Sequence, residues 1–153
     1  GLMIVDNEPF LIEYNVRMGD PECQTILPML RSDLFDILLA CVDEKLKEIQ
    51  IEWKNLQSLC IVLCSKGYPD EYKKNIKISN LAKLNLDENN YLFHAGTKKE
   101  NNETLAIGGR VLNFISLSSN LISARKNVLE NLNKLNWDKG FFRKDIAFKV
   151  IDK

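Results

Sequence analysis

The run FLIEYNVRMGD, residues 10–20, decides how the first part of this chain folds. It opens with three apolar residues that are typical of a β-strand, in which alternate side chains share one face. One face would then carry an apolar, core-facing set: Phe10, Ile12, Tyr14 and Val16. The other face would carry Glu13, Asn15 and Arg17, with successive side chains about 6.6 Å apart at the usual rise of a strand.

The polar row of Glu13, Asn15 and Arg17 has the composition of a binding site. Carboxylate and amide oxygens are ligands that Mg²⁺ prefers, and a fixed guanidinium forms a fork that binds phosphate or carboxylate. The row therefore indicates a place where a metal ion and an anionic substrate meet. The spacing alone fits an ordinary charged strand edge equally well.

The residues that follow the row have the form of a helix start. Asp20 would be the N-cap, Pro21 would take the first helical position and Glu22 would lie in the first turn. Gly19 would let the backbone approach a neighbour closely. A strand that presents ligands and leads into a helix N-terminus can bind an anion.

The composition is that of a globular protein with a core, since 45% of the 153 residues are hydrophobic and 27% are charged. The length suggests one domain, or one small domain and part of another. The 21 Lys and Arg residues balance the 21 Asp and Glu residues, so we expect no nucleic-acid partner. Because the sequence has no apolar run of about 18 residues and no signal-peptide pattern, we expect a cytoplasmic chain without a membrane partner.

Two further features concern the state of the chain. Its four cysteines lie in apolar surroundings without a Cys/His pair at metal-ligand spacing: Cys23, Cys41, Cys60 and Cys64. We expect buried, reduced thiols rather than a zinc site or a disulfide. The chain also opens with Gly1 inside a strand-like run, which suggests a fragment of a longer protein.

The first third of the chain predicts a β-hairpin followed by two helices. These elements cover residues 1–5 and 10–16, residues 21–30 with an interruption near Pro28, and a helix capped by Ser32 that runs to about residue 47. The Lys- and Glu-rich stretch 43–54 indicates a domain boundary, which we place after residue 44.

The remainder predicts short strands around one long helix. Strands are expected over residues 58–64, 77–78, 91–94, 104–107, 110–116 and 142–150. Gly108 and Gly109 indicate a hairpin turn. Asn120 would cap an amphipathic helix with an apolar side made of Leu121, Ala124, Val128, Leu129, Leu132 and Leu135. The fold class is therefore α+β, with a small, mostly antiparallel β domain and flanking helices.

Several blocks of the sequence resemble one family of ligases. The block RMGDPECQ at residues 17–24 resembles the motif Arg-(Leu/Phe)-Gly-Asp-Pro-Glu-x-Gln of phosphoribosylamine–glycine ligases, also called glycinamide ribonucleotide synthetases. Further blocks follow in the family's order: LP at 27–28, SDL at 32–34, SKGYP at 65–69, FHAGT at 93–97, GGRVL at 108–112 and RKDI at 143–146. Together they span nearly the whole chain, which makes the resemblance specific.

The resemblance implies that the chain is the C-terminal part of such an enzyme. Residues 1–44 resemble the end of its ATP-grasp domain, and residues 45–153 resemble its C-terminal domain. The family joins glycine to 5-phosphoribosylamine in purine biosynthesis, giving glycinamide ribonucleotide and converting ATP to ADP and phosphate through a glycyl-phosphate intermediate. The expected partners are ATP, glycine, 5-phosphoribosylamine and a missing N-terminal part of the same enzyme, without which this part would be inactive.

The resemblance also gives roles to the polar row. Glu13 and Asn15 fall on the family's metal ligands, which hold Mg²⁺ or Mn²⁺, with two ions accompanying ATP. Arg17 would be catalytic and would clamp the transferred phosphoryl group or the glycine carboxylate; a salt bridge to Asp20 or Glu22 is the structural alternative. Gly19 and Asp20 would shape the acceptor pocket.

Three positions depart from the family pattern: Met18 replaces Phe or Leu, no glycine follows Pro69, and Ala147 replaces a common glycine. These departures concern backbone shape more than chemistry. We interpret the single histidine, His94, as structural, and we expect Tyr68, Trp53 and Trp137 to pack in the core. Arg110 is either a surface residue after the turn, which we favour, or part of a loop that closes over the active site.

Two other functions are alternatives to the ligase hypothesis. A non-catalytic scaffold or binding module derived from an ATP-grasp ligase is one, although a scaffold has no reason to carry the row of Glu13, Asn15 and Arg17. Another ATP-grasp ligase or carboxylase is the second, and the blocks at residues 17–24 and 93–97 argue against it.

Overall fold

The computed structural model describes residues 1–151, which form two antiparallel sheets, a separate hairpin and four α-helices. In chain order the elements are β1 (Leu2–Val5), β2 (Glu8–Leu11), α1 (Glu22–Ile26), η1 (Leu27–Met29), α2 (Leu34–Val42), η2 (Leu46–Glu48), β3 (Gln57–Ser65), β4 (Ile76–Lys77), η3 (Leu81–Lys83), β5 (Asn90–His94), β6 (Thr97–Glu100), β7 (Glu103–Ala106), β8 (Arg110–Ser118), α3 (Leu121–Leu135), β9 (Gly140–Phe141) and α4 (Phe148–Ile151). The η elements are short 3₁₀ turns. The predicted α+β class with antiparallel strands is confirmed.

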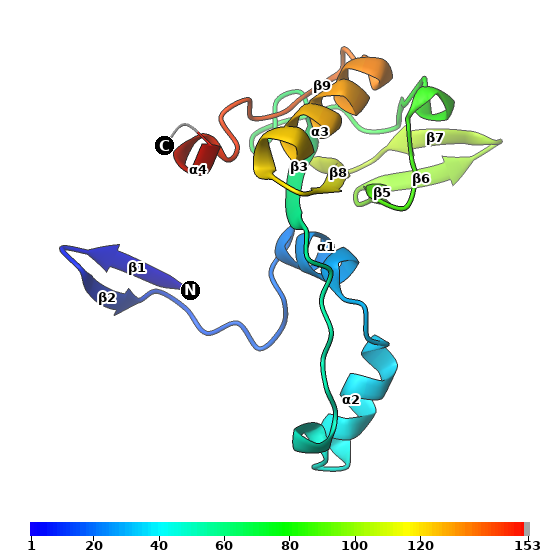
Figure 1. Cartoon of the computed structure of the whole chain (residues 1–153). Coiled ribbons are helices and arrows are strands. Elements are labelled where there is room, and N and C mark those ends of the chain that lie inside the picture. Colours follow the sequence, from blue (N-terminus) through cyan, green and yellow to red (C-terminus); the bar gives the residue numbers. More distant parts are fainter. Residues whose placement is uncertain (152–153) are drawn as a thin grey trace.

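The central sheet has the order β5-β8-β3-β9, with every neighbouring pair antiparallel. Helix α3 lies across one face of this sheet (Figure 1). The core lies between them and joins Leu59, Ile61 and Leu63 of β3 to Ala124, Val128 and Leu132 of α3. In β3 the buried residues alternate with half-buried ones, so the strand has a second face that points away from α3.

Helix α3 begins at the cap that the sequence predicts. The side-chain oxygen of Asn120 accepts a hydrogen bond from the backbone N–H of Ser123 at 2.8 Å, which caps the helix. Asn136 ends it in the left-handed conformation, at φ 45°. The predicted apolar side is confirmed at Ala124, Val128, Leu132 and Leu135, all of which are buried.

The second face of β3 is covered by the short helix α1. Cys60, which alternates with the core residues of β3, lies beside Thr25 of α1. Helix α1 gives way to the 3₁₀ turn η1 at Leu27, so the predicted interruption near Pro28 is confirmed.

The second sheet has three strands in the order β4-β7-β6. Its hairpin turns at Asn101 and Asn102, which adopt φ of 47° and 61°, as a tight two-residue turn requires. The sequence did not predict β6. The hairpin predicted at Gly108 and Gly109 is wrong, because β7 belongs to this sheet whereas β8 belongs to the central one.

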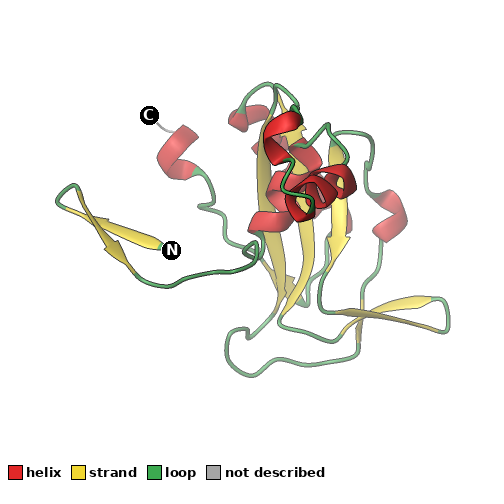
Figure 2. Cartoon of the chain, turned by 90° about the horizontal axis from the view of Figure 1, so that it is seen from below, coloured by secondary structure: helices red, strands yellow, loops and turns green. Residues whose placement is uncertain are grey.

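The N-terminal hairpin stands apart from both sheets (Figures 1 and 2). It turns at Asp6 and Asn7, with φ of 50° and 65°. Strand β2 ends at Leu11, opposite Leu2 of β1, whereas a strand to residue 16 was predicted. Gly1 still bonds the backbone of Ile12 and Glu13. The predicted core-facing set is also wrong: Tyr14 and Val16, for example, are 86% and 102% exposed.

Helix α2 sits in an excursion of the chain that is closed by an isolated bridge between Leu30 and Trp53. Asp33, rather than the predicted Ser32, caps it by accepting from the backbone N–H of Phe35 at 2.7 Å. The helix ends at Val42 instead of residue 47, and Glu44 adopts φ 59°, which is incompatible with a continuing helix. The boundary after residue 44 stays a prediction.

The strand predicted over residues 142–150 is wrong. Only β9 pairs with the sheet there, and the chain then turns into α4. The physical reason is Arg125 of α3, whose guanidinium donates hydrogen bonds to the backbone carbonyls of Lys144 and Ile146 at 2.5 and 3.1 Å. These carbonyls bind a side chain instead of a neighbouring strand. No helix in residues 1–151 is long and apolar enough to cross a membrane.

Candidate functional site

The predicted metal ligands lie together in the segment that links β2 to α1. The amide Nδ2 of Asn15 donates a hydrogen bond to Oε1 of Glu13 at 2.9 Å, so the two side chains share one side of an extended backbone. Both line an open hollow of about 680 Å³, and Arg17 lines the same hollow. The structure therefore places the carboxylate, the amide and the guanidinium of the row around one space.

Arg17 does not form the salt bridge that was its structural alternative. Its Nη1 donates to the carbonyl of its neighbour Met18 at 2.8 Å. The two acidic candidates have other partners: Glu22 accepts from the backbone N–H of Gly19 at 2.6 Å, and Asp20 binds Arg110. Within residues 1–151, Arg17 has no carboxylate at salt-bridge distance, so its charge remains available to an anion in the hollow.

The start of α1 differs from the prediction by one residue. The helix begins at Glu22, with Pro21 in the capping position and no side chain capping it. Asp20 is therefore not the cap. Gly19 lies close to Glu22: a Cβ at position 19 would lie 2.8 Å from the Glu22 carboxylate, the end of a flexible side chain.

Asp20 instead joins the polar segment to the central sheet. Its Oδ2 lies 3.1 Å from Nη2 of Arg110, and its backbone carbonyl accepts from Nη1 of the same guanidinium at 3.1 Å. Its Oδ1 accepts from the side-chain amide of Gln24 at 2.9 Å. Sequence reasoning favoured a surface role for Arg110 and so missed this contact, because no local pattern signals a contact between residues 90 positions apart.

The turn that precedes Arg110 is itself held firmly. The hydroxyl of Ser65 donates to the carbonyl of Gly108 at 2.8 Å, and the backbone N–H of Ser65 donates to Gly109 at 2.8 Å. Gly96 and Gly108 approach so closely that a Cβ on Gly96 would lie 2.6 Å from the Cα of Gly108. Arg110 thus projects from a well-fixed backbone.

The donor set of the hollow suits a hard divalent cation. Glu13 supplies an anionic oxygen and Asn15 a neutral one, and Mg²⁺ commonly takes only one or two protein ligands beside water and phosphate oxygens. Within the described residues, no group of three or more His, Cys, Asp and Glu side chains could hold a metal by itself. His94 is exposed and its Nδ1 lies 3.0 Å from the hydroxyl of Thr97, which fits the structural role expected of it.

All four cysteines carry free thiols, but none is fully buried as expected: Cys41 is exposed, and Cys23, Cys60 and Cys64 are half-buried. Burial raises the pKa of Cys60 to about 12. A hydrogen bond with Thr25 lowers this pKa in part, and the negative charge of Asp20 raises it. Burial likewise raises the pKa of Cys64, although the nearby Arg110 charge lowers it. Both thiols are therefore poor nucleophiles at neutral pH.

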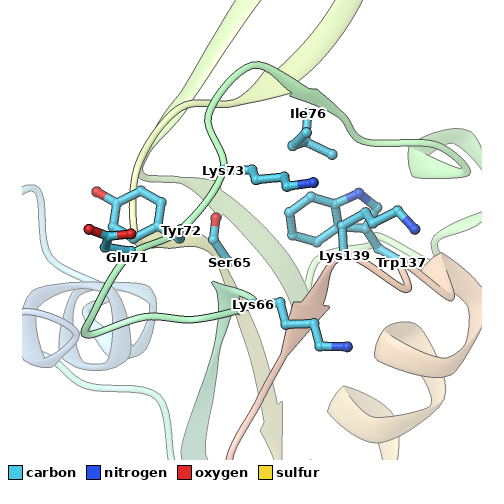
Figure 3. Close-up of a pocket in the computed structure, with 8 residues that line it drawn as sticks. All are labelled: Ser65, Lys66, Glu71, Tyr72, Lys73, Ile76, Trp137 and Lys139. Carbon is cyan, nitrogen blue, oxygen red and sulfur yellow. The ribbon is translucent and has the colours of Figure 1, made fainter.

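A second hollow, of about 440 Å³, lies beyond the end of β3, where three lysines surround Trp137: Lys66, Lys73 and Lys139 (Figure 3). The indole N–H of Trp137 donates to the carbonyl of Lys77 at 2.9 Å, and its ring packs against Gly140. These contacts support the packing role expected of Trp137. Trp53, in contrast, is 51% exposed and is not a core residue.

Comparison with known proteins gives one consistent family. The family model described as "Phosphoribosylglycinamide synthetase, C domain" matches residues 58–149. The chain is 40% identical over its full length to a phosphoribosylamine–glycine ligase of Brucella melitensis, of which it covers 36%. It is 42% identical over 151 residues to the ligase of Agrobacterium fabrum, covering 99% of this chain and 35% of that one.

A solved structure gives the same result. The crystal structure of a phosphoribosylamine–glycine ligase from Thermotoga maritima matches with a TM-score of 0.70 and 28% identity, over 95% of this chain and 35% of that one. The chain thus spans about a third of the length of the curated relatives it matches.

Proposed function

The chain belongs to the phosphoribosylglycinamide synthetase family, and from that premise we propose that it supplies the C-terminal part of a ligase that joins glycine to 5-phosphoribosylamine at the expense of ATP. Residues 1–44 would be the end of the ATP-grasp domain, and residues 45–153 the C-terminal domain. ATP, glycine and 5-phosphoribosylamine would be its substrates. The product would be glycinamide ribonucleotide.

One observation carries this proposal: Glu13, Asn15 and Arg17 line a single hollow in the segment that precedes the block RMGDPECQ. A carboxylate and an amide oxygen can bind the metal ion of a nucleoside triphosphate, and a guanidinium beside them can bind its phosphates. A scaffold would not need these three groups on one side of an exposed segment. The exposed position of the hollow is what a site completed by another part of an enzyme requires.

Glu13 and Asn15 would hold Mg²⁺ or Mn²⁺ with ATP, and one such ion supplies charge compensation for the phosphoryl group in transfer. Arg17 would bind the transferred phosphoryl group or the glycine carboxylate, since no carboxylate of residues 1–151 lies at salt-bridge distance from its guanidinium. Gly19 and Asp20 would shape the acceptor pocket. His94 would take no part, because the carboxylate and amine that react are already nucleophiles.

The apolar surface of the hairpin and of α2 supports a larger assembly around this chain. Several large apolar side chains in these elements are more than half exposed: Leu2, Met3, Ile4, Phe10, Leu11, Phe35, Leu38 and Val42. Such surface is typical of a contact with another part of a protein. We infer that the rest of the ligase packs against these two elements.

A chimera tests the proposal. In this chimera, the chain would replace the matching part of the Brucella melitensis ligase, and the rest of that ligase would be kept. ADP formation from ATP would then be measured in the presence of glycine and 5-phosphoribosylamine. We expect glycine-dependent ADP formation. A chimera that unfolds in one cooperative transition and binds ATP, yet forms no ADP when the intact Brucella ligase does so in parallel, would contradict the proposal.

A further inference from the structure

We propose that Arg110 is a positioning residue that fixes the segment carrying Glu13, Asn15 and Arg17 by holding Asp20 at two points. The inference rests on the proposed function for its consequence in catalysis, but the geometric part stands on this chain alone. Arg110 would not itself touch the reacting groups. It would act through Asp20.

The contact geometry gives the first argument. A single guanidinium binds both the carboxylate Oδ2 and the backbone carbonyl of Asp20, each at 3.1 Å. A carboxylate contact alone would leave the backbone free to rotate, whereas the second contact fixes the peptide that links Asp20 to Pro21. Arginine can do this because its donors lie in a rigid plane, and a lysine ammonium cannot reproduce that fork.

The remaining oxygen of Asp20 gives the second argument. Its Oδ1 accepts from Gln24, one turn into α1, so both carboxylate oxygens are bound by protein groups. Asp20 is therefore engaged in holding this junction. Gln24 and Arg110 hold it from opposite directions, one from the helix that follows and one from the central sheet.

The anchor itself is rigid, which gives the third argument. The turn before Arg110 is tied to β3 by the two hydrogen bonds of Ser65, and it packs without space against Gly96. The segment that carries the polar row is held differently: Gly1 bonds the backbone of Ile12 and Glu13, and the side chains of Asn15 and Arg17 bond residues of the segment itself. Arg110 therefore ties the end of this segment to a rigid sheet through Asp20, next to the place where α1 packs on β3.

Burial separates a positioning role from a stabilising one. The side chains of Arg110 and Asp20 are each 43% exposed, and exposed ion pairs contribute little to stability. Loss of the pair should therefore change the position of the segment more than it changes the stability of the fold. A displacement of about 1 Å at a catalytic group can lower a rate roughly 100-fold.

The first test uses the whole chain and needs no activity. Trypsin can cut after Arg17, and the three residues that follow the cut include Asp20, which must leave its anchor for the protease to bind. We expect Arg110→Gln to speed cleavage at Arg17 about threefold to tenfold, since cleavage follows the population of the opened segment. Arg110→Lys keeps the charge but not the planar set of donors, so its cleavage rate at Arg17 should lie between those of the unmodified chain and of Arg110→Gln.

Arg143→Gln is the matched control. Arg143 also pairs with an aspartate, at 2.6 Å from Asp145, but that partner lies only two residues away in the sequence, and the pair makes no bond to residues 12–20. It should leave cleavage at Arg17 unchanged. Equal cleavage rates for the Arg110→Gln variant and the unmodified chain would overturn the proposal.

The second test places the same variants in the chimera. We expect Arg110→Gln to lower kcat about 10- to 100-fold with the KM for ATP changed less than about threefold, because geometry rather than ground-state binding is lost. Arg110→Lys should recover part of the rate. An unaltered kcat in an active chimera would overturn the catalytic consequence, whereas an inactive unmodified chimera with altered trypsin cleavage would count against the proposed function and leave the positioning role supported.

Discussion

Asn15 donates a hydrogen bond from its side-chain amide to the carboxylate of Glu13, two residues before it, at 2.9 Å. The pair shows that the two side chains reach the same space on one side of the backbone. If both side chains are to hold a cation, Asn15 must present its Oδ1 instead of its NH₂ group. Rotation of the amide about the Cβ–Cγ bond achieves this without moving the backbone.

The first prediction concerns the unequal importance of these two residues. Glu13→Ala should lower the rate of the chimera roughly 100-fold or more at saturating Mg²⁺, because it removes the only charged protein ligand that we propose for the ion. Asn15→Ala should cost only about 10-fold, because water can replace a neutral oxygen. Steady-state ADP formation measures both. Glu8→Ala, which removes an exposed carboxylate in the same hairpin, serves as the control, and equal rates for Glu13→Ala and the unmodified protein would refute the assignment.

The second prediction concerns thiol reactivity. Burial raises the pKa of Cys60 to about 12, whereas Cys41 is exposed. Because only the thiolate is alkylated, iodoacetamide at pH 8 should modify Cys41 at least about 100-fold faster than Cys60 in the folded chain. Peptide mass spectrometry after timed quenching gives both rates. In denaturant the two rates should converge, and comparable rates in the folded chain would show that α1 does not cover this face of β3.

The same pKa shift predicts the sign of a pH effect on stability. The folded-state pKa of Cys60 lies above its unfolded value, so the unfolded chain releases the proton first as the pH rises. The contribution of this thiol to the free energy of unfolding is therefore fully present below about pH 9 and is lost as the pH rises towards 12. Urea unfolding at pH 8 and 10 should show a larger loss of stability for the native sequence than for Cys60→Ala.

The fourth prediction concerns the close contact of two turns. A Cβ at position 96 would lie 2.6 Å from the Cα of Gly108 and 2.7 Å from the carbonyl oxygen of Arg110. Both neighbours are backbone atoms, so Gly96→Ala should lower the free energy of unfolding by about 2 kcal/mol or more. Gly1→Ala, where the nearest atom is the flexible side chain of Glu13 at 3.3 Å, should change it by less than about 0.5 kcal/mol. Urea denaturation measures the difference, and equal midpoints would contradict it.

The fifth prediction concerns Ala147, which stands where relatives of this type were expected to carry a glycine. It adopts φ 68°, a conformation that costs an alanine about 1–2 kcal/mol, whereas glycine adopts it freely. After the greater flexibility of glycine in the unfolded chain is subtracted, Ala147→Gly should raise the free energy of unfolding by about 0.5 kcal/mol. Ala124→Gly, in the buried face of α3, should lower it by about 1 kcal/mol or more. Opposite signs in urea melts are the expected outcome, and a loss of stability in both variants would refute the argument.

Much of the fold follows from the sequence because local patterns specify it. The continuous apolar run of β3, the Asn120 cap and the 3.6-residue apolar side of α3 are local features, and each forms the predicted element. The predicted elements that are wrong lie where a residue distant in the sequence hydrogen-bonds the backbone. The segment after Phe141 was expected to be a strand, but Arg125 of α3 binds its carbonyls.

Glycine pairs show the same limit. Gly108 and Gly109 have the local form of a hairpin turn, yet the chain crosses there from one sheet to another because Gly96 leaves room for a backbone contact. The side chains of Glu13 and Asn15 meet, as their spacing indicated, but Tyr14 and Val16, expected on the opposite face, line the same hollow. The assignment of residues 13, 15 and 17 to metal and phosphate stays a prediction.

By itself the sequence determined the central strands and helix of the core and the meeting of Glu13 with Asn15, since each of these depends on neighbours within a few residues. It also determined the α+β class and the family, which follow from patterns and motifs along the whole chain. Only the tertiary structure decided which sheet each short strand joins and how Asp20 meets Arg110. Those outcomes depend on groups up to 90 residues apart that compete for the same backbone and carboxylate partners.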